Sequence, residues 1–191
     1  MFNNRQAFED SVFASRPAYP DAALASVEVA WEVYRAAANT DHNMLLLGRW
    51  VGQADEANPG IDGLVQGNFH IMDEVFTGGA VMNSNRWTIL VNDAWVLGGI
   101  HAHTPFYLAS PRTLANLYQD DANRLTVTGR ELVGLRAFGY QVNPSDLGEV
   151  AVCQNVDGGH QRALAADASF EAYAVAVQEM SVNNAWHALA V

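Results

Sequence analysis

The chain contains no lysine, because all ten of its basic residues are arginine. It has one cysteine, Cys153, so an internal disulfide framework is excluded and nothing in the chain requires an oxidising compartment. No apolar run approaches the roughly 18 residues that a membrane-spanning helix needs. The N-terminal stretch MFNNRQAFEDSVF lacks a basic segment followed by an apolar one. We therefore expect neither a membrane span nor an ordinary secretory signal.

The absence of lysine has two interpretations. Coding bias is a poor explanation, since lysine and asparagine codons share their first two bases and asparagine occurs 15 times. One interpretation is drift in a small sample. The other is avoidance of lysine-directed modification such as ubiquitination, which would suit a protein delivered into foreign cytoplasm.

The composition is that of a folded protein with few charges. Half of the 191 residues are apolar and 16% are charged, which excludes a disordered chain and fits one domain with a sizeable core. The formal net charge is -11, and the arginines are scattered along the chain. Because nucleic-acid binders need a basic footprint, the charge favours a small-molecule substrate, a basic protein partner, or solubility.

Apolar residues at helical spacing alternate with short apolar runs. Helical patterns and capping signals predict helices at residues 5–14, 21–38, 84–99, 128–139 and 168–185. The predicted apolar stripe of the second helix is Leu24, Val27, Trp31 and Tyr34, and that of the last is Phe170, Tyr173, Val177 and Met180. In the segment 84–99, which also suits a strand and hairpin, Asn83 and Ser84 would cap a helix and Gly98-Gly99 would stop it. Strands are expected in NMLLLG, LVQGNFHIM, PFYLASP, YQV and VAVC. This alternation predicts an α/β layered fold with a short, largely parallel sheet flanked by helices.

We expect one domain over residues 1–191. Its predicted parts are an N-terminal helical segment, 1–40, packed on an α/β core, 41–160, and a C-terminal helix within 165–191. Turn residues such as those in NPSDLGE do not divide the chain, so the sequence predicts no linker between domains.

Glu131 is a carboxylate on an apolar helix face. Thr128 and Glu131 match a capping box, in which each side chain bonds the other residue's backbone amide. The helical wheel, however, places Glu131 between Leu135 and Phe138, on the core side. An acid there, in a first turn just after a strand, would lie where α/β sheets bind ligands, and it could act as a nucleophile or stabilise an oxocarbenium ion. Both roles remain open, and one residue can have both.

Two sequence resemblances bear on that choice. The segment GRELVGLRAFGYQV, which contains Glu131, resembles the region around the nucleophilic glutamate of nucleoside 2-deoxyribosyltransferases, and the stretch from Tyr107 to Pro111 resembles the strand motif before it. Residues 92–142, through NDAWVLGGI, FYLASP and GRELVGLRAFGYQV, resemble a C-terminal toxin domain of Rhs and contact-dependent polymorphic toxins. The upstream LLLG also fits, but Arg49-Trp50 follow it where the toxin pattern has a histidine-rich turn. No single position matches the acid that accompanies the nucleophile in the transferases.

The resemblances imply a single Rossmann-like domain that attacks a ribosyl C–N bond in NAD, a nucleoside or a nucleotide, needs no cofactor or metal, and acts as a bacterial toxin. Such a protein stays in the cytoplasm or is exported by a specialised secretion system, and its partners are a nucleotide-like substrate and a cognate immunity or chaperone protein. The implied catalytic residues are Glu131, with Asp93 as a possible auxiliary acid. The implied substrate-binding residues are Tyr107 and Ser110, near the base or ribose. Arg49, Arg112 and Arg130 each lie next to a predicted strand end or helix start, where an arginine can bind a phosphate or carboxylate or form a surface ion pair, and we expect Arg49 or Arg130 near the phosphate.

Three further patterns were weighed. His101 and His103 alternate as metal ligands on a strand do, but we expect satisfied core or loop histidines. Asp157 and His160 lie in a glycine-rich stretch, which is either a turn or a substrate loop carrying an acid/base pair, so His160 is a further candidate for substrate binding. Cys153 lies in an apolar strand and is expected to be an inert thiol.

The alternative function is non-catalytic. The negative charge would suit an acidic binding protein of the immunity or inhibitor type that masks a basic partner. This alternative predicts acidic residues clustered on one face, whereas the enzyme predicts dependence on Glu131.

Overall fold

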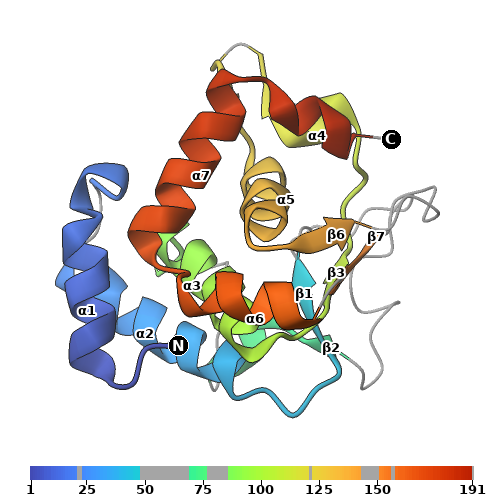
Figure 1. The fold of residues 1–191 in the computed structure, drawn as a ribbon. Coiled ribbons are helices and arrows are strands. Elements are labelled where there is room, and N and C mark those ends of the chain that lie inside the picture. Colours follow the sequence, from blue (N-terminus) through green and yellow to red (C-terminus); the bar gives the residue numbers. More distant parts are fainter. Residues whose placement is uncertain are drawn as a thin grey trace.

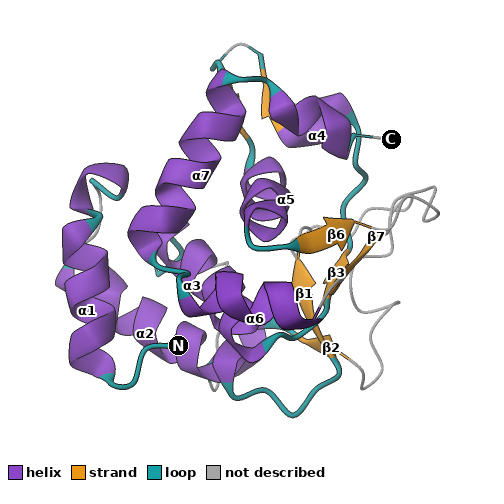
Figure 2. Cartoon of the chain, in the orientation of Figure 1, coloured by secondary structure: helices purple, strands orange, loops and turns teal. Residues whose placement is uncertain are grey.

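The computed structural model describes residues 1–20, 23–47, 69–76, 86–120, 122–142, 151–155 and 158–190. Figure 1 shows the order of the elements and Figure 2 their type. The helices are α1 (Arg5–Ala14), α2 (Leu24–Ala38), α3 (Ile89–Ala102), α4 (Leu114–Leu117), α5 (Val127–Ala137), α6 (Gly158–Ala166) and α7 (Phe170–Val182). Short 3-10 turns are η1 (Arg16–Ala18), η4 (Met72–Val75) and η5 (Ala185–Leu189). None of these described helices has the length and hydropathy needed to cross a bilayer.

The protein is mixed α/β, with one five-stranded sheet in the order β2-β1-β3-β7-β6. Its strands are β1 (Met44–Leu47), β2 (Phe69–His70), β3 (Phe106–Leu108), β6 (Tyr140–Val142) and β7 (Ala151–Asn155). β1 pairs in parallel with both β2 and β3, whereas β7 is antiparallel to β3 and to β6. The parallel character is therefore confined to three adjacent strands, and β7 is the reversed one. A separate two-stranded sheet joins β4 (Tyr118–Gln119) to β5 (Arg124–Leu125).

Helix α3 is the centre of the fold, because every residue from Leu90 to His101 is buried. Two glycines allow close packing on its two sides. A Cβ on Gly98 would lie 2.5 Å from the carbonyl oxygen of Tyr34 in α2, and a Cβ on Gly99 would lie 2.4 Å from the Phe106 ring in β3. α3 therefore fits between α2 and the sheet, and in Figure 1 the helices α1, α2 and α7 lie to the left of the strands.

This packing corrects the predicted boundaries of α3. Gly98 and Gly99 were expected to stop the helix, but they lie inside it, and the chain leaves the helix at His103, whose φ of 57° is left-handed. Thr88 caps the start by accepting a hydrogen bond from the Val91 amide. The expected caps, Asn83 and Ser84, lie outside the described residues. Contact with neighbouring elements outweighs the usual tendency of glycine to end a helix.

The other predicted elements are largely confirmed. α1 has the predicted bounds. On α7, Phe170, Tyr173 and Val177 of the predicted stripe are buried, and Met180 is partly buried against the core. On α2 the predicted stripe is wrong at its start, since Leu24 is 80% exposed. Helix α6 is a correction: the glycine-rich stretch around His160 was expected to be a turn or loop, but it forms a helix from Gly158.

One apolar cluster includes described residues from Phe8 to Leu189 and contains α3. Along β3, Phe106 and Leu108 belong to this cluster, whereas Tyr107 packs with Leu46 and Ala109 in a second, smaller one. Because successive side chains of a strand point to opposite faces, Tyr107 faces away from α3.

Candidate functional site

The helix that carries Glu131 is capped by a different threonine from the one expected. α5 begins at Val127, and the Thr126 hydroxyl accepts a hydrogen bond of 3.0 Å from the Gly129 amide. The predicted capping box of Thr128 and Glu131 is therefore wrong, because Glu131 lies in the second turn and beyond the reach of the cap. Glu131 therefore does not cap the helix, and of the two roles expected from the sequence only the chemical one is left.

Glu131 is buried, with 3% of its surface exposed. Leu132, Val133 and Leu135 of the same helix are also buried, so the carboxylate belongs to the core-facing part of α5 as the helical wheel predicted. A buried carboxylate must be compensated by hydrogen bonds or charge, and such positions are candidates for functional acids as well as for structural ones.

The strand before α5 lies elsewhere than expected. Among the described strands β5 pairs with β4 alone, in the small sheet, so Glu131 does not follow a strand of the main sheet. The start of α5 instead packs on α4: the Thr126 amide donates to the Leu117 carbonyl at 3.0 Å, and a Cβ on Gly129 would lie 2.0 Å from that same oxygen. Since α4 follows the carboxyl end of β3, the first turns of α5 lie beside the segment that leaves this strand.

Asp93 and Arg130 were both predicted at the site, and the structure brings them together. The Arg130 Nε donates to both carboxylate oxygens of Asp93, at 2.9 and 3.0 Å, and a terminal nitrogen approaches Oδ2 at 2.5 Å. The Asp93 side chain is fully buried and that of Arg130 is 17% exposed. The pair joins α3 to α5 immediately before Glu131, so most of the guanidinium is engaged within the protein.

Two tyrosines complete this pair, and sequence reasoning missed both. The Tyr19 hydroxyl donates to Asp93 Oδ2 at 2.5 Å, and the Tyr173 hydroxyl donates to the Arg130 carbonyl at 3.2 Å. The Arg130 guanidinium lies 5.7 Å from the centre of the Tyr19 ring and 5.6 Å from that of Tyr173. Aromatic faces at this distance stabilise a buried cation. Gly134 leaves room for Tyr173, because a Cβ there would lie 2.2 Å from the ring.

Burial and charge act in opposite directions on this pair. The pKa of Asp93 is raised, because burial outweighs the charge and hydrogen bonds of Arg130 and the hydrogen bond of Tyr19, which lower it. Burial acts to lower the pKa of Arg130, but the Asp93 carboxylate raises it above its ordinary value. Burial and the nearby Asp93 charge also raise the pKa of the Tyr19 hydroxyl, which therefore stays protonated as a donor. We take the pair as ionised at neutral pH, since a guanidinium is not deprotonated in proteins.

The other predicted residues are more dispersed. Tyr107 is half-buried on the far face of β3, where its ring centre lies 4.5 Å from that of Phe69. Ser110 is buried just beyond the carboxyl end of β3, as is Arg112, a second arginine weighed at the sequence level. Since α4 begins at Leu114, Ser110 and Arg112 are on the segment that reaches the start of α5. Ser110 therefore lies on the segment that leads to the start of α5, whereas Tyr107 lies on the opposite face of the sheet.

His160 is exposed on α6, and Arg49 and Asp157 lie outside the described residues. The histidine pair is not on a strand as the metal interpretation required. His101 is buried near the end of α3, where Nδ1 bonds the Tyr34 hydroxyl at 2.8 Å and Nε2 the Ala168 carbonyl at 3.0 Å. It is thus a satisfied core histidine. Within the described part of the chain no three histidine, cysteine or acidic residues are placed to hold a metal ion.

A cavity of about 400 Å³ lies elsewhere, beside α2. Its lining residues are Ala25, Ser26, Glu28, Val29, Glu32, Phe76 and Arg86. The carboxylates of Glu28 and Glu32 lie 3.9 and 3.7 Å from the guanidinium groups of Arg5 and Arg35. Their charges are therefore partly neutralised, and Glu131 does not line this cavity.

No protein family, curated protein sequence or solved structure matches the chain. The functional argument therefore rests on the geometry around α5.

Proposed function

We propose that the protein is an enzyme that cleaves or transfers an N-ribosyl bond of NAD, a nucleoside or a nucleotide, with Glu131 as its central acid. The observation that carries this proposal is the buried Glu131 carboxylate, set in the second turn of α5 directly after the Asp93–Arg130 pair. The pair is neutral as a whole, so it fixes α5 against α3 without cancelling a charge on Glu131. The resemblance of this segment to deoxyribosyltransferases points to the same residue.

The chemistry follows from the acid. As the bond between the ribose C1′ and the base nitrogen breaks, positive charge develops on the ring oxygen and C1′. A Glu131 carboxylate beside C1′ either stabilises that charge or attacks C1′ to form a glycosyl ester, which water or another acceptor then displaces. At 3% exposure, the carboxylate meets a substrate only when neighbouring side chains move. We therefore expect slow turnover and a conformational step on substrate binding.

The proposed position within the fold is the carboxyl end of β3. The three parallel strands have the order β2-β1-β3, which is the strand order at the start of a doubly wound, flavodoxin-like sheet. In such sheets ligands bind at the carboxyl ends of the two strands that flank the switch point, and here these strands are β1 and β3. Ser110 and Arg112 follow β3 directly, and both are buried polar residues that would bind ribose hydroxyls or phosphate. On this basis we propose a Rossmann-like relationship for the sheet, with Arg130 and Asp93 as positioning residues.

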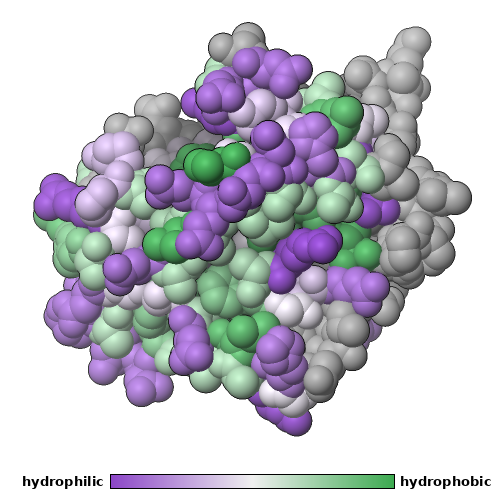
Figure 3. Space-filling view, turned by 45° about the horizontal axis from the view of Figure 1, so that its top comes forward, coloured by the Kyte–Doolittle hydropathy of each residue, from purple (hydrophilic) through white to green (hydrophobic). Residues whose placement is uncertain are grey.

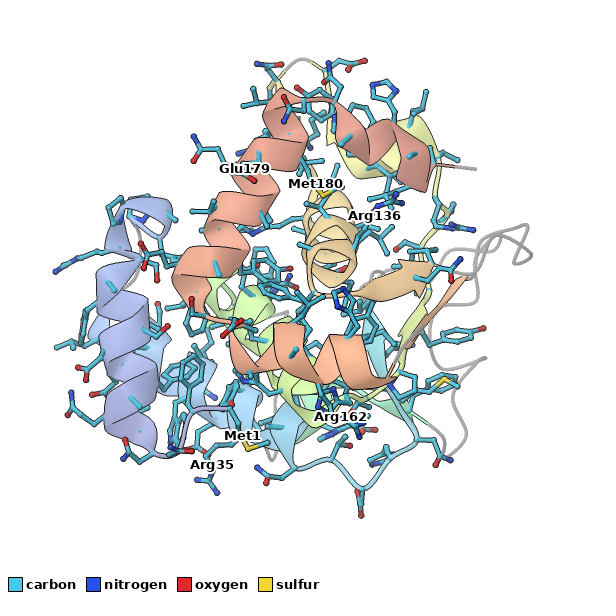
Figure 4. The ribbon with its side chains drawn as sticks, viewed as in Figure 1. Met1, Arg35, Arg136, Arg162, Glu179 and Met180 are labelled. Carbon is cyan, nitrogen blue, oxygen red and sulfur yellow. The ribbon has the colours of Figure 1, made fainter. Side chains whose placement is uncertain are left out.

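We also propose that the protein is a delivered toxin. Of the nine described arginines, seven are exposed: Arg5, Arg16, Arg35, Arg86, Arg124, Arg136 and Arg162. Figure 4 labels three of these, Arg35 on α2, Arg136 on α5 and Arg162 on α6. Exposed positions ordinarily tolerate lysine as well as arginine, so their composition favours avoidance of lysine over packing requirements.

The binding-protein alternative is less well supported by the described surface. It expects acidic residues gathered on one face, but on α1 and α2 carboxylates alternate with arginines in the pairs Arg5–Glu9, Arg5–Glu28 and Arg35–Glu32. Figure 3 shows by hydropathy that hydrophilic and hydrophobic residues are interspersed over the face that it draws. We therefore keep the enzyme as the leading proposal.

The proposal is tested by incubating the purified protein with NAD and, separately, with nucleosides, and measuring the free base by chromatography. Glu131→Gln should abolish base release while the circular dichroism spectrum is unchanged. Glu179→Gln, the same substitution at an exposed position of α7, is the matched control and should retain activity. Base release that survives Glu131→Gln would remove the residue from the mechanism.

A further inference from the structure

His42 and His70 stack on each other at the edge of the main sheet. Their ring centres lie 5.0 Å apart with 22° between the ring planes. His42 lies in the turn between α2 and β1, and His70 ends β2, the edge strand. Among the described residues, β2 pairs with β1 over two positions, Met44 with Phe69 and Leu45 with His70. The imidazole contact therefore adds a side-chain attachment between this short pairing and the turn after α2.

Thr40 joins the two histidines. Its hydroxyl oxygen lies 3.0 Å from His70 Nδ1 and accepts a hydrogen bond of 3.1 Å from the His42 backbone amide. With His70 neutral and Nδ1 unprotonated, the Thr40 hydroxyl donates to Nδ1 while its oxygen accepts from the His42 amide. On the other side, His70 packs against the Trp95 ring of α3 at 5.2 Å between ring centres.

We propose that His42 and His70 form an acid-sensitive latch, which holds the turn after α2 against β2 while both imidazoles are neutral and releases it when both are protonated. Two imidazolium groups stacked at 5.0 Å repel each other. The Thr40 hydroxyl can donate to a neutral Nδ1 of His70 or accept from a protonated one, so the repulsion between the two rings, and not the loss of this hydrogen bond, opens the latch.

In the part of the chain that the structure describes, the charged groups near the pair do not reverse this effect. From the turn, Asp41 lies 3.7 Å from His42 Nε2, but its side chain is 99% exposed, so solvent screens it. From η4, Glu74 is also exposed, and α3 contributes the uncharged Trp95. Burial and the charge of His42 lower the pKa of His70, whereas Glu74 and Asp41 raise it less.

The sign of the pH dependence follows. Because the pKa of His70 is lower in the closed form than in a free histidine, the contact is fully formed above pH ~6.5 and is lost as pH falls below it. Each unit by which the pKa is lowered makes the open form about tenfold more populated once the pH lies below both values.

Amide hydrogen exchange on the full chain tests the latch. Between pH 7.5 and 5.5, after correction for the intrinsic pH dependence of exchange, Phe69 and His70 should lose more protection than α3, which itself loses some as His101 becomes protonated. His42→Gln removes one of the two charges and should reduce this loss. His187→Gln, at an exposed histidine outside the pair, should leave it unchanged. Equal loss in His42→Gln, no loss in the wild type, or a loss no larger than that of α3 would each overturn the proposal.

A second measurement serves if His42→Gln does not fold. NMR titration of the imidazole signals in the wild type should show His70 titrating below the ordinary histidine pKa and coupled to His42. His70 titrating at the ordinary value, independently of His42, would refute the latch. Neither experiment measures base release from nucleosides, so each tests the latch independently of the proposed enzyme activity.

Discussion

The guanidinium of Arg130 binds both carboxylate oxygens of Asp93 across the contact between α5 and α3. Solvent screens these two charges little, since the Asp93 side chain is fully buried and that of Arg130 is 17% exposed. Removing one partner leaves the other as an uncompensated buried charge. This relationship makes the position of Glu131, the next residue along α5, depend on an ion pair.

Asp93→Asn should therefore destabilise the protein by about 3–5 kcal/mol in urea unfolding, because Arg130 loses its counter-charge. The double variant Asp93→Leu with Arg130→Met removes both charges and should recover much of that loss. Were Asp93→Asn to unfold at the same urea concentration as the wild type, the pair would not be what fixes α5.

Gly129 sets how closely α5 packs on α4. A Cβ added at this position would lie 2.0 Å from the Leu117 carbonyl oxygen, a backbone atom that cannot rotate away. Gly129→Ala should cost about 1–3 kcal/mol through overpacking, despite the better helix propensity of alanine. Arg136→Ala on the exposed side of the same helix serves as the control and should change the unfolding free energy by less than about 0.5 kcal/mol.

Because His101 is buried as a neutral ring, we predict that the protein loses stability in acid. Burial, chiefly, lowers the pKa of His101 to about 4, below the ordinary value near 6.5. The folded state therefore resists protonation of this ring more than the unfolded state does. The stability that neutral His101 contributes is present above pH ~6.5 and is lost as pH falls toward 4, by about 2–3 kcal/mol at pH 4.5. Urea unfolding at pH 7.5 and 4.5 should show a smaller difference for His101→Gln, and equal differences would contradict this.

Local patterns predicted the helices well, and tertiary contacts explain the failures. The stripe of α7 is visible in sequence because its residues repeat at helical spacing. Gly98 and Gly99 are stop signals locally, yet they lie inside α3 because α2 and β3 approach too closely for larger side chains. The strand before α5 was assigned to the main sheet, since nothing in two residues, Arg124 and Leu125, tells which strand they will pair with.

The candidate site was predictable in part. The helical wheel placed Glu131 in the core, and Asp93 and Arg130 were both selected, but not as partners of each other. Their pairing spans 37 residues of sequence, and no spacing rule connects them. Tyr19 was missed for the same reason, because it reaches Asp93 from a segment that precedes α2.

Lysine avoidance can be tested at exposed sites. Arg16, Arg136 and Arg162 are exposed on three separate elements, so replacing all three with lysine should leave the unfolding free energy within about 0.5 kcal/mol per site. In a eukaryotic cytosolic extract, however, the triple lysine variant should be degraded faster than the wild type, and a proteasome inhibitor should remove the difference. The matched control replaces the same arginines with glutamine. Equal lifetimes for the lysine and wild-type proteins would favour drift.

The most direct test of the enzyme is the release of free base from NAD or a nucleoside by purified wild type, Glu131→Gln and Glu179→Gln proteins at equal concentration. We predict release by the wild type and by Glu179→Gln, and a loss of at least about 100-fold for Glu131→Gln, the size expected when a catalytic group is removed. No release by the folded wild type, or equal release by Glu131→Gln, would contradict the account.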